Sequence, residues 1–291
     1  MSTVKRSSGE MVFDVANAIC LIIFSLLCIY PFLYVFNISV SKGASSAQYG
    51  LNLLPKGFTL EYYKQLFRTD AILTGLKNSV LRTISGTFLA VLVTSCGAYP
   101  LSKKYLPNRK FWTTIILIPM FFGGGLIPTY LLIKSLRLID TRWVLILPGL
   151  VSTYNLILIR NYMISLPESL EESAKIDGAN DIIILFRIIL PICKPILATV
   201  ALWVAVGHWN AWFDSLLYIT KKELVVLQVV LYQVLNWGSE RTVTGTMDNY
   251  NPAQEIIKAC TIMVTTIPII LTYPFLQKYF IGSIMVGSVK G

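Results

Sequence analysis

Residues 165–191 read SLPESLEESAKIDGANDIIILFRIILP, a charged segment that separates the fourth and fifth long apolar stretches of the chain. Ser165 and Glu168 have the Ser-x-x-Glu spacing of a capping box. Pro167 falls in the first turn, where its missing N–H does no harm. Gly178 can adopt the left-handed conformation that ends many helices. The segment therefore predicts a helix of about three turns, a bend at Gly178, and a second helix from about Asn180 to residue 190.

The surrounding sequence is suited to lipid. Of the 291 residues, 55% are hydrophobic and only 14% are charged, and the mean hydropathy is +0.64. A helix needs about 20 apolar residues to cross the hydrocarbon core of a bilayer. The first apolar stretch follows Lys5 and Arg6 but is too long for a signal peptide, so we interpret it as an uncleaved span. Six stretches are long enough: 13–40, 72–100, 111–134, 142–162, 191–219 and 257–280. The predicted fold class is all-α, a polytopic membrane protein with six transmembrane helices.

The spacing within the charged segment narrows its interpretation. By composition alone it could be an ordinary interfacial loop helix. Residues 172–174 (ESA), Gly178 and residues 188–191 (IILP) are separated by three and nine residues, a pattern that resembles the EAA motif of importer-type ABC transporter permeases. Ser173 is the one departure, and its small side chain still permits close packing. In that family this loop is the coupling helix, which docks on a cytoplasmic ATPase subunit.

Other segments resemble the carbohydrate-uptake permeases of the maltose G-subunit type, in the branch for complex oligosaccharides and uronides. The resemblance covers roughly residues 70–291 and implies the type I ABC importer permease fold. Residues 1–71 would then form the N-terminal tail, first span and an outer loop, 72–281 the permease core, and 282–291 a cytoplasmic tail. The segments that carry the resemblance are GLIPTY at 125–130, ILPG at 146–149, AKIDG at 174–178, GHWN at 207–210 and GSVKG at 287–291.

The same resemblance implies the residues that couple this chain to the ATPase. Leu170, Ala174 and Gly178 share one helix face by i, i+4 spacing and are expected to pack on the partner, with Glu171 and Glu172 making polar contacts. The predicted coupling set is Leu170, Glu171, Glu172, Ala174, Asp177 and Gly178. The tail residues Val289, Lys290 and Gly291 are also expected at the ATPase interface.

The chain lacks the phosphate-binding loop of an ATPase. Gly123-Gly-Gly125 has neither the lysine nor the hydroxyl that hold phosphates. We therefore expect no catalytic residues and no enzyme activity in this chain, with ATP and magnesium bound by the partner ATPase subunits. The triple glycine lies mid-span between Pro119 and Pro128, which favours a kink near the pathway over plain helix packing. The five cysteines are interpreted as small apolar fillers, and no metal site is expected.

Aromatic and amide side chains mark a candidate substrate pathway. Sugars bind to aromatic faces and to hydrogen-bonding groups, although tryptophan and tyrosine are also common at membrane interfaces. The predicted pathway residues are Tyr154, Asn155, Trp203, His208, Trp209 and Asn210. The span centres are otherwise nearly free of ionisable groups, which argues against an ion-coupled secondary transporter. That class and an ABC permease for a non-sugar solute are the alternatives.

The number of lysine and arginine residues is nearly equal on the two sides, so the positive-inside rule does not orient the chain. The basic loop at 103–110 favours the cytoplasm, and the coupling assignment requires both termini to be cytoplasmic, in a multi-pass protein of the cell membrane. Nucleic acid is not expected, because no basic stripe alternates with aromatic residues. The implied partners are a second permease subunit in a heterodimer, two ATPase subunits, membrane lipid, an oligosaccharide whose charge the sequence leaves open, and an extracellular solute-binding lipoprotein received by the outer segments 41–71 and 220–256.

Overall fold

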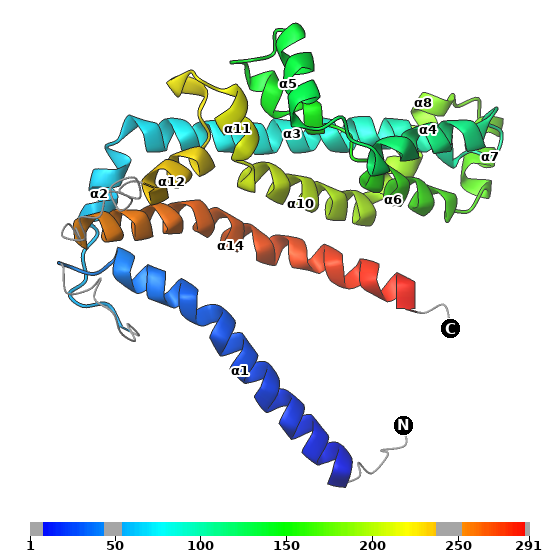
Figure 1. The fold of residues 1–291 in the computed structure, drawn as a ribbon. Coiled ribbons are helices and arrows are strands. Elements are labelled where there is room, and N and C mark those ends of the chain that lie inside the picture. Colours follow the sequence, from blue (N-terminus) through cyan, green and yellow to red (C-terminus); the bar gives the residue numbers. More distant parts are fainter. Residues whose placement is uncertain (1–7, 44–53, 237–251, 289–291) are drawn as a thin grey trace. The chain divides into compact units, whose positions relative to one another are not determined.

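The computed structural model describes the backbone of residues 8–43, 54–236 and 252–288, and the side chains of 9–43, 54–236 and 253–272 (Figure 1). Within these ranges the chain is helical, and its β pairing is limited to an isolated antiparallel bridge between Ser41 and Phe58. Two compact units are formed. One comprises Met1–Thr69 with Val234–Thr266, and the other comprises Asp70–Gln233 with Ile267–Gly291.

The first unit contains α1 (Ser8–Ser39), α2 (Glu61–Phe67) and the start of α14 (Pro252–Ser288). Its contacts converge on the last residue of α1. The Tyr63 hydroxyl donates to Ser39 Oγ at 2.8 Å, and the Cys260 thiol donates to the Ser39 carbonyl at 3.3 Å. These bonds fix the end of α1 against α2 and α14.

The second unit is organised around α3 (Asp70–Ser102), which packs along α10 (Lys194–Asn210) and α6 (Thr153–Ile164), as Figure 1 shows. Small residues allow this close approach. A Cβ atom on Gly86 would lie only 2.5 Å from Nε2 of His208 in α10, a separation that side chains do not tolerate. Glycine at this position therefore lets the two helices pack closely, as small residues commonly do in membrane proteins.

Three of the predicted spans are broken rather than straight. Helix α4 (Arg109–Phe121) and α5 (Leu126–Ser135) meet at 113°, and the chain between them contains the triple glycine, with Gly125 at φ +82°. Two short 3-10 turns, η2 (Arg142–Leu145) and η3 (Leu147–Gly149), meet α6 at 54°. The predicted kink at residues 123–125 is thus confirmed. Non-helical backbone is tolerated at membrane depth where it is enclosed by protein or lines a cavity.

The third break precedes α10. The helical segment Asp181–Ile192 meets it at 82°, and consists of α8 (Asp181–Ile184), the π-helical η4 (Leu185–Ile189) and α9 (Leu190–Ile192). Among the residues that the structure describes, three helices are long and apolar enough to cross a membrane alone, and the number rises to six if each bent pair is one span. The six predicted apolar stretches correspond to these three helices and three bent pairs.

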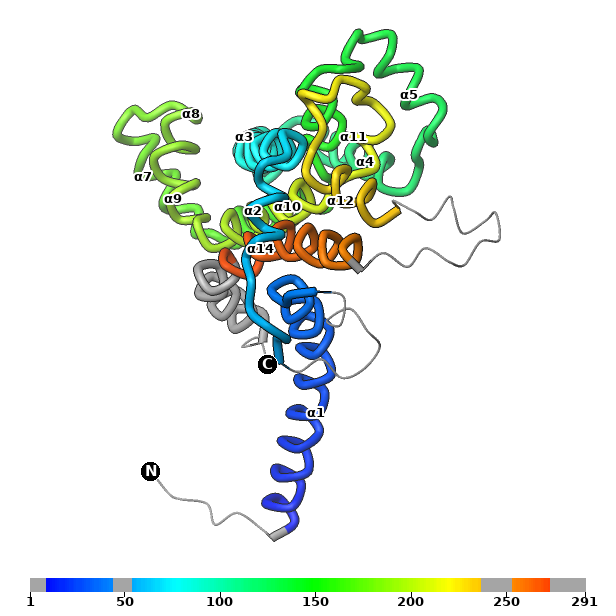
Figure 2. The backbone as a smooth tube through the Cα atoms, turned by 90° about the vertical axis from the view of Figure 1, so that its left-hand side faces the viewer, coloured from blue at the N-terminus to red at the C-terminus, as the bar shows by residue number. Residues whose placement is uncertain are grey.

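The remaining elements are α7 (Ser169–Ile176), α11 (Phe213–Tyr218), η5 (Lys222–Leu224) and α12 (Leu227–Asn236). Helices α7 and α8 lie beside the Ser102 end of α3, whereas α5 and α11 lie toward its other end (Figure 1). Figure 2, viewed at right angles, places α7, α8 and α9 together on one side of α3. The two ends of α3 therefore contact different parts of the unit.

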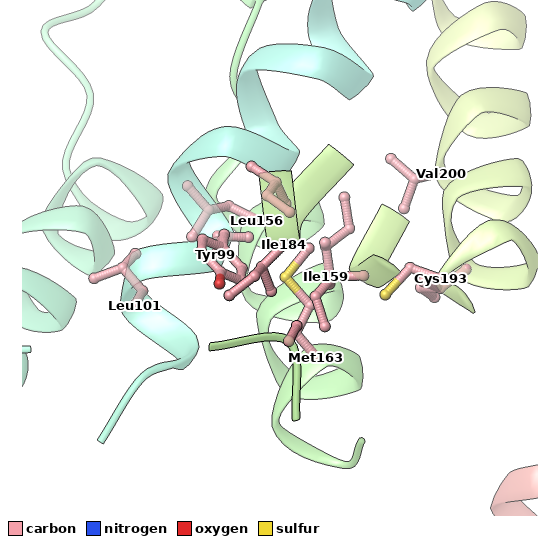
Figure 3. Close-up of a cluster of buried hydrophobic side chains, with 13 residues drawn as sticks. Tyr99, Leu101, Leu156, Ile159, Met163, Ile184, Cys193 and Val200 are labelled. Atoms are coloured by element: carbon pink, nitrogen blue, oxygen red, sulfur yellow. The ribbon is translucent and has the colours of Figure 1, made fainter. Parts of the chain in front are cut away.

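A buried apolar cluster attaches the α7–α9 segment to α3 and α6 (Figure 3). Burial of such side chains stabilises the unit by about 25 cal/mol for each Å² of apolar surface removed from solvent. Cys193 lies in this cluster as an apolar filler, as predicted. The cluster consists of Ala98, Tyr99, Leu101, Leu156, Ile159, Met163, Ala174, Ile184, Leu185, Ile189, Cys193, Ile196 and Val200.

Candidate coupling helix and transport pathway

The coupling helix begins later than the sequence predicted. Helix α7 starts at Ser169, with Glu168 as its N-cap and no side-chain capping bond. Ser165 instead ends α6, where its hydroxyl donates to the carbonyl of Tyr162 at 2.7 Å. The predicted capping box is therefore wrong, because Ser165 belongs to the end of the preceding helix. Helix α7 is 8 residues long rather than about three turns.

The predicted stop at Gly178 is confirmed. Its φ is +80°, its N–H donates to the Lys175 carbonyl at 3.0 Å, and the N–H of Ala179 donates to the Ala174 carbonyl at 2.9 Å. These are the two hydrogen bonds of a Schellman motif. Asn180 then caps α8 by accepting a hydrogen bond from the N–H of Ile183 at 2.9 Å. The second predicted helix thus begins where expected, although its middle is π-helical.

The faces of α7 differ from the prediction. Ala174 is only 7% exposed and packs in the chain's own core, and Leu170 is half-buried. The small-to-apolar stripe thus holds α7 onto its own subunit at Ala174, and the contact predicted between Ala174 and the ATPase stays a prediction. Ile176, in contrast, is 86% exposed. The surface open to a partner is formed by Ser169, Glu172, Ser173, Ile176, Asp177 and Gly178.

The two adjacent glutamates of the motif have different surroundings. Glu172 is exposed. Glu171 forms an ion pair with Lys103, just beyond the end of α3, and the two side chains are 17% and 9% exposed. The ammonium of Lys103 also lies 4.1 Å from the ring centroid of Tyr99. Of the two glutamates predicted to contact the ATPase, only Glu172 is free to do so.

Further polar contacts surround this pair at the surface. Lys104 lies 2.5 Å from Glu168, and its hydrogen bond and charge lower the pKa of that carboxyl. Lys175 lies 3.4 Å from Asp181 and 4.6 Å from the ring centroid of Tyr105. The short segment after α3 therefore contacts both helices of the coupling loop.

The predicted pathway residues fall into two groups. Tyr154 and Trp203 are exposed, with ring centroids 6.0 Å apart, and Asn210 is exposed on the same stripe of α10 as Trp203. Trp209 is only 7% exposed and His208 faces α3, so both contact their own subunit. Asn155 is half-buried. The structure supports a candidate pathway surface of Tyr154, Trp203, Gly207 and Asn210, and it removes Trp209 from the surface.

The sequence profile described as binding-protein-dependent transport system inner membrane component matches residues 86–281. The chain belongs to this family. It is 42% identical over 290 residues to Protein LplC of Bacillus subtilis (strain 168), covering 99% of this chain and 98% of that protein. It is 38% identical to the polygalacturonan/rhamnogalacturonan transport system permease protein YtcP of the same strain, covering 93% and 96%.

Solved structures agree with this family assignment. A bacterial ABC transporter involved in the import of the acidic polysaccharide alginate matches with a TM-score of 0.86 and 33% identity, over 96% of this chain and 100% of that chain. A second alginate transporter chain, from a complex with a pentasaccharide-bound periplasmic protein, matches with a TM-score of 0.60 at 16% identity and shows the fold alone. The protein is thus an ABC importer permease with the type I fold, and the secondary-transporter alternative is wrong.

The permease also contains a buried charged group that sequence reasoning missed. Arg82 of α3 is 6% exposed and forms an ion pair with Asp214 of α11, donating through Nη1 to Oδ1 at 3.1 Å. It also donates to the carbonyl of Ala211 at 3.3 Å and to Nδ1 of His208 at 3.4 Å. Charged residues within membrane spans are normally paired in this way. The sequence places both residues near span ends, and their opposite charges are the one feature of the sequence from which the ion pair could have been predicted.

A second carboxylate holds the segment between α5 and η2 of the permease. Asp140 accepts hydrogen bonds from the N–H and hydroxyl of Thr220, both at 2.6 Å, and from the N–H of Lys221 at 3.0 Å. These hydrogen bonds lower the pKa of the Asp140 carboxyl. They connect the segment after α5 with the segment after α11.

The predicted ATPase contacts at Val289, Lys290 and Gly291 lie outside the described residues. Helix α14 reaches Ser288. The tail contacts therefore stay a prediction.

Proposed function

We propose that this permease imports an acidic oligosaccharide that an extracellular binding protein delivers, and that separate ATPase subunits drive the import. The observation that carries the proposal is the similarity over nearly the whole chain to a permease of the alginate importer, at 33% identity and a TM-score of 0.86. The relative YtcP, named for polygalacturonan and rhamnogalacturonan, supports the same substrate class. The same similarities argue against the alternative of an ABC permease for a non-sugar solute.

The exposed face of α7 is the proposed contact with an ATPase subunit. Ile176 supplies an isolated, accessible apolar side chain, and Glu172 and Asp177 supply acceptors beside it. An apolar anchor surrounded by polar groups is the usual composition of a protein–protein contact. This assignment places α7, the segment 103–110 and both termini in the cytoplasm. ATP and magnesium would be bound by the two ATPase subunits and not by this chain.

The proposed substrate pathway runs along the exposed stripe of α10. Tyr154 and Trp203 offer aromatic faces, and Asn210 offers an amide. A Cβ atom added to Gly207 would meet nothing within 4 Å, so there is space beside this residue. Flat aromatic surfaces pack on the apolar faces of sugar rings, and amides hydrogen-bond to their hydroxyls. A second permease subunit would close the other side of the pathway.

The proposed docking surface for the binding protein lies in the outer segments. The structure describes residues 41–43 and 54–71 of one segment, and 220–236 and 252–256 of the other. Basic side chains are exposed there, including Lys64, Arg68 and Lys221. Residues 41–69 belong to one compact unit, whereas the second segment is divided between the two units after residue 233, so each part is proposed as a contact by itself.

Transport by the reconstituted complex tests the proposal. The permease is co-expressed with the subunits encoded beside it and placed in proteoliposomes with ATP inside and the binding protein outside. Uptake of a radiolabelled oligogalacturonide and an alginate pentasaccharide is compared with that of a neutral arabino-oligosaccharide of similar length. ATP-dependent uptake of an acidic sugar, with little uptake of the neutral one, is expected. Preference for the neutral sugar, or uptake of none, would overturn the assignment of substrate class.

A further inference from the structure

The end of α3 is attached to the coupling loop by a buried charged residue. Helix α3 ends at Ser102, and the next residue, Lys103, pairs with Glu171 of α7. The same ammonium lies over the ring of Tyr99, one turn earlier in α3. Lys103 therefore contacts both the helix it follows and the coupling helix.

Burial makes this ion pair different from its neighbour. The Lys103 and Glu171 side chains are 9% and 17% exposed, whereas those of the adjacent pair, Lys104 and Glu168, are 78% and 66% exposed. An exposed pair contributes little and is screened by salt. Removing one member of a buried pair leaves the other charge without compensation, which is strongly unfavourable. The inner pair can therefore hold α7 in a fixed orientation, and the outer pair cannot.

Helix α3 is also the element best placed to carry a movement across the membrane. Its 33 residues extend about 50 Å at 1.5 Å per residue. Near Ser102 its Leu101 carbonyl accepts a hydrogen bond from Arg160 of α6 at 3.0 Å. Further along, Arg82 holds Asp214 and the Ala211 carbonyl, which flank the break between α10 and α11. One continuous helix thus joins the coupling loop to the candidate pathway.

We propose that Lys103 is a positioning residue for transport, which makes α7 and α3 move as one body when the ATPase subunits displace α7. The inference rests on the proposed docking of α7 on an ATPase subunit. Glu171 and Glu172 then have separate tasks, since Glu171 faces inward to Lys103 and Glu172 faces the partner. Without Lys103, α7 stays attached through Ala174 and the apolar cluster, but α7 can then move relative to the end of α3, so its displacement is not passed on to α3.

The test compares transport with ATP hydrolysis in the reconstituted complex. Lys103→Met is expected to keep the ATPase subunits bound and hydrolysing while the sugar transported per ATP falls about tenfold, within the usual range for coupling between sites. The conservative Lys103→Arg should keep most of the wild-type ratio. Lys104→Met is the matched control, and its ratio should equal that of wild type.

A double variant separates coupling from folding. Lys103→Met with Glu171→Met removes both charges together, so it leaves no uncompensated buried charge and should assemble normally. If this assembled double variant transports as much sugar per ATP as wild type, the proposal for Lys103 is wrong. A reduced ratio in the double variant, with partial recovery in the charge-swapped pair Lys103→Glu and Glu171→Lys, supports it.

A further variant distinguishes a failure of the inference about Lys103 from a failure of the proposed docking of α7 on the ATPase. Ile176→Asp places a charge on the exposed face of α7 and should release the ATPase subunits during co-purification. If Ile176→Asp has no effect on association, the docking assignment is wrong. If it releases the ATPase while every Lys103 variant couples normally, only the inference about Lys103 is overturned.

Discussion

Removal of the Asp214 carboxylate should destabilise the permease through the charge it leaves behind. In Asp214→Ala the guanidinium of Arg82 keeps its contacts with the Ala211 carbonyl and His208 but loses its anionic partner. Breaking a buried ion pair by removing one partner costs about 3–5 kcal/mol. Arg82 is almost fully buried, but the side chain of Asp214 is 30% exposed, so water can enter the vacated space. We therefore expect the lower end of that range, about 3 kcal/mol.

The size of this effect can be tested against two further variants. Arg82→Met combined with Asp214→Ala leaves no charge in the site, so the double variant should be more stable than Asp214→Ala alone. Lys104→Ala breaks the exposed pair with Glu168 and should leave stability essentially unchanged. Each protein is purified in the same detergent with the exposed Cys20, Cys28 and Cys96 replaced by alanine, and its thermal unfolding is followed by the fluorescence of a thiol-reactive dye on the buried Cys193 and Cys260.

The expected order of melting temperature is wild type and Lys104→Ala together, then the double variant, then Asp214→Ala. A double variant that melts below Asp214→Ala would show that Arg82 contributes through its packing and other hydrogen bonds rather than through charge. Equal melting temperatures for Asp214→Ala and wild type would refute the argument that Arg82 depends on its partner.

Three single positions give further predictions. Gly86→Ala places a Cβ 2.5 Å from Nε2 of His208 and should cost about 1–3 kcal/mol by overpacking. The resulting fall in melting temperature should be largely reversed by adding His208→Ala. If it is not reversed, the clash lies with another residue. Gly178→Val forces a β-branched residue to φ +80°, at a cost of about 1–3 kcal/mol, so the ATPase subunits should co-purify poorly with this variant. Asparagine tolerates that backbone conformation, so Gly178→Asn should retain the ATPase subunits. Because the pKa of Asp140 is lowered, its hydrogen bonds stabilise the protein above the ordinary carboxyl pKa, and this stabilisation is lost as the pH falls through the lowered value. The difference in melting temperature between wild type and Asp140→Ala should therefore be constant near neutral pH and shrink only below about pH 4. A difference that does not vary with pH would refute this role of Asp140.

Local features of the sequence predicted local features of the structure. The apolar stretches located the spans because a bilayer imposes a minimum length of apolar helix. Gly178 predicted the end of α7 because few other residues adopt its backbone conformation, and the triple glycine predicted a broken span. Each of these depends on a few neighbouring residues, so the sequence alone was sufficient.

Features that depend on distant residues were not predictable in this way. Whether Ser165 caps α7 or ends α6 depends on how far α6 extends, and the spacing to Glu168 could not decide that. Which face of α7 is buried depends on α3 and α6, so the sequence did not show that Ala174 packs within its own subunit. Arg82 and Asp214 are 132 residues apart in sequence, and no local pattern connects them.

The π-helical stretch Leu185–Ile189 has a consequence for how this loop can evolve. A π segment corresponds to one extra residue within an α-helix, and each residue of an α-helix turns the chain by about 100°. Deletion of a single residue there would restore regular α-helix and rotate the coupling loop about the axis of the helical segment Asp181–Ile192. A lineage can therefore change the direction in which the loop faces by a one-residue insertion or deletion, without altering the residues that contact either partner.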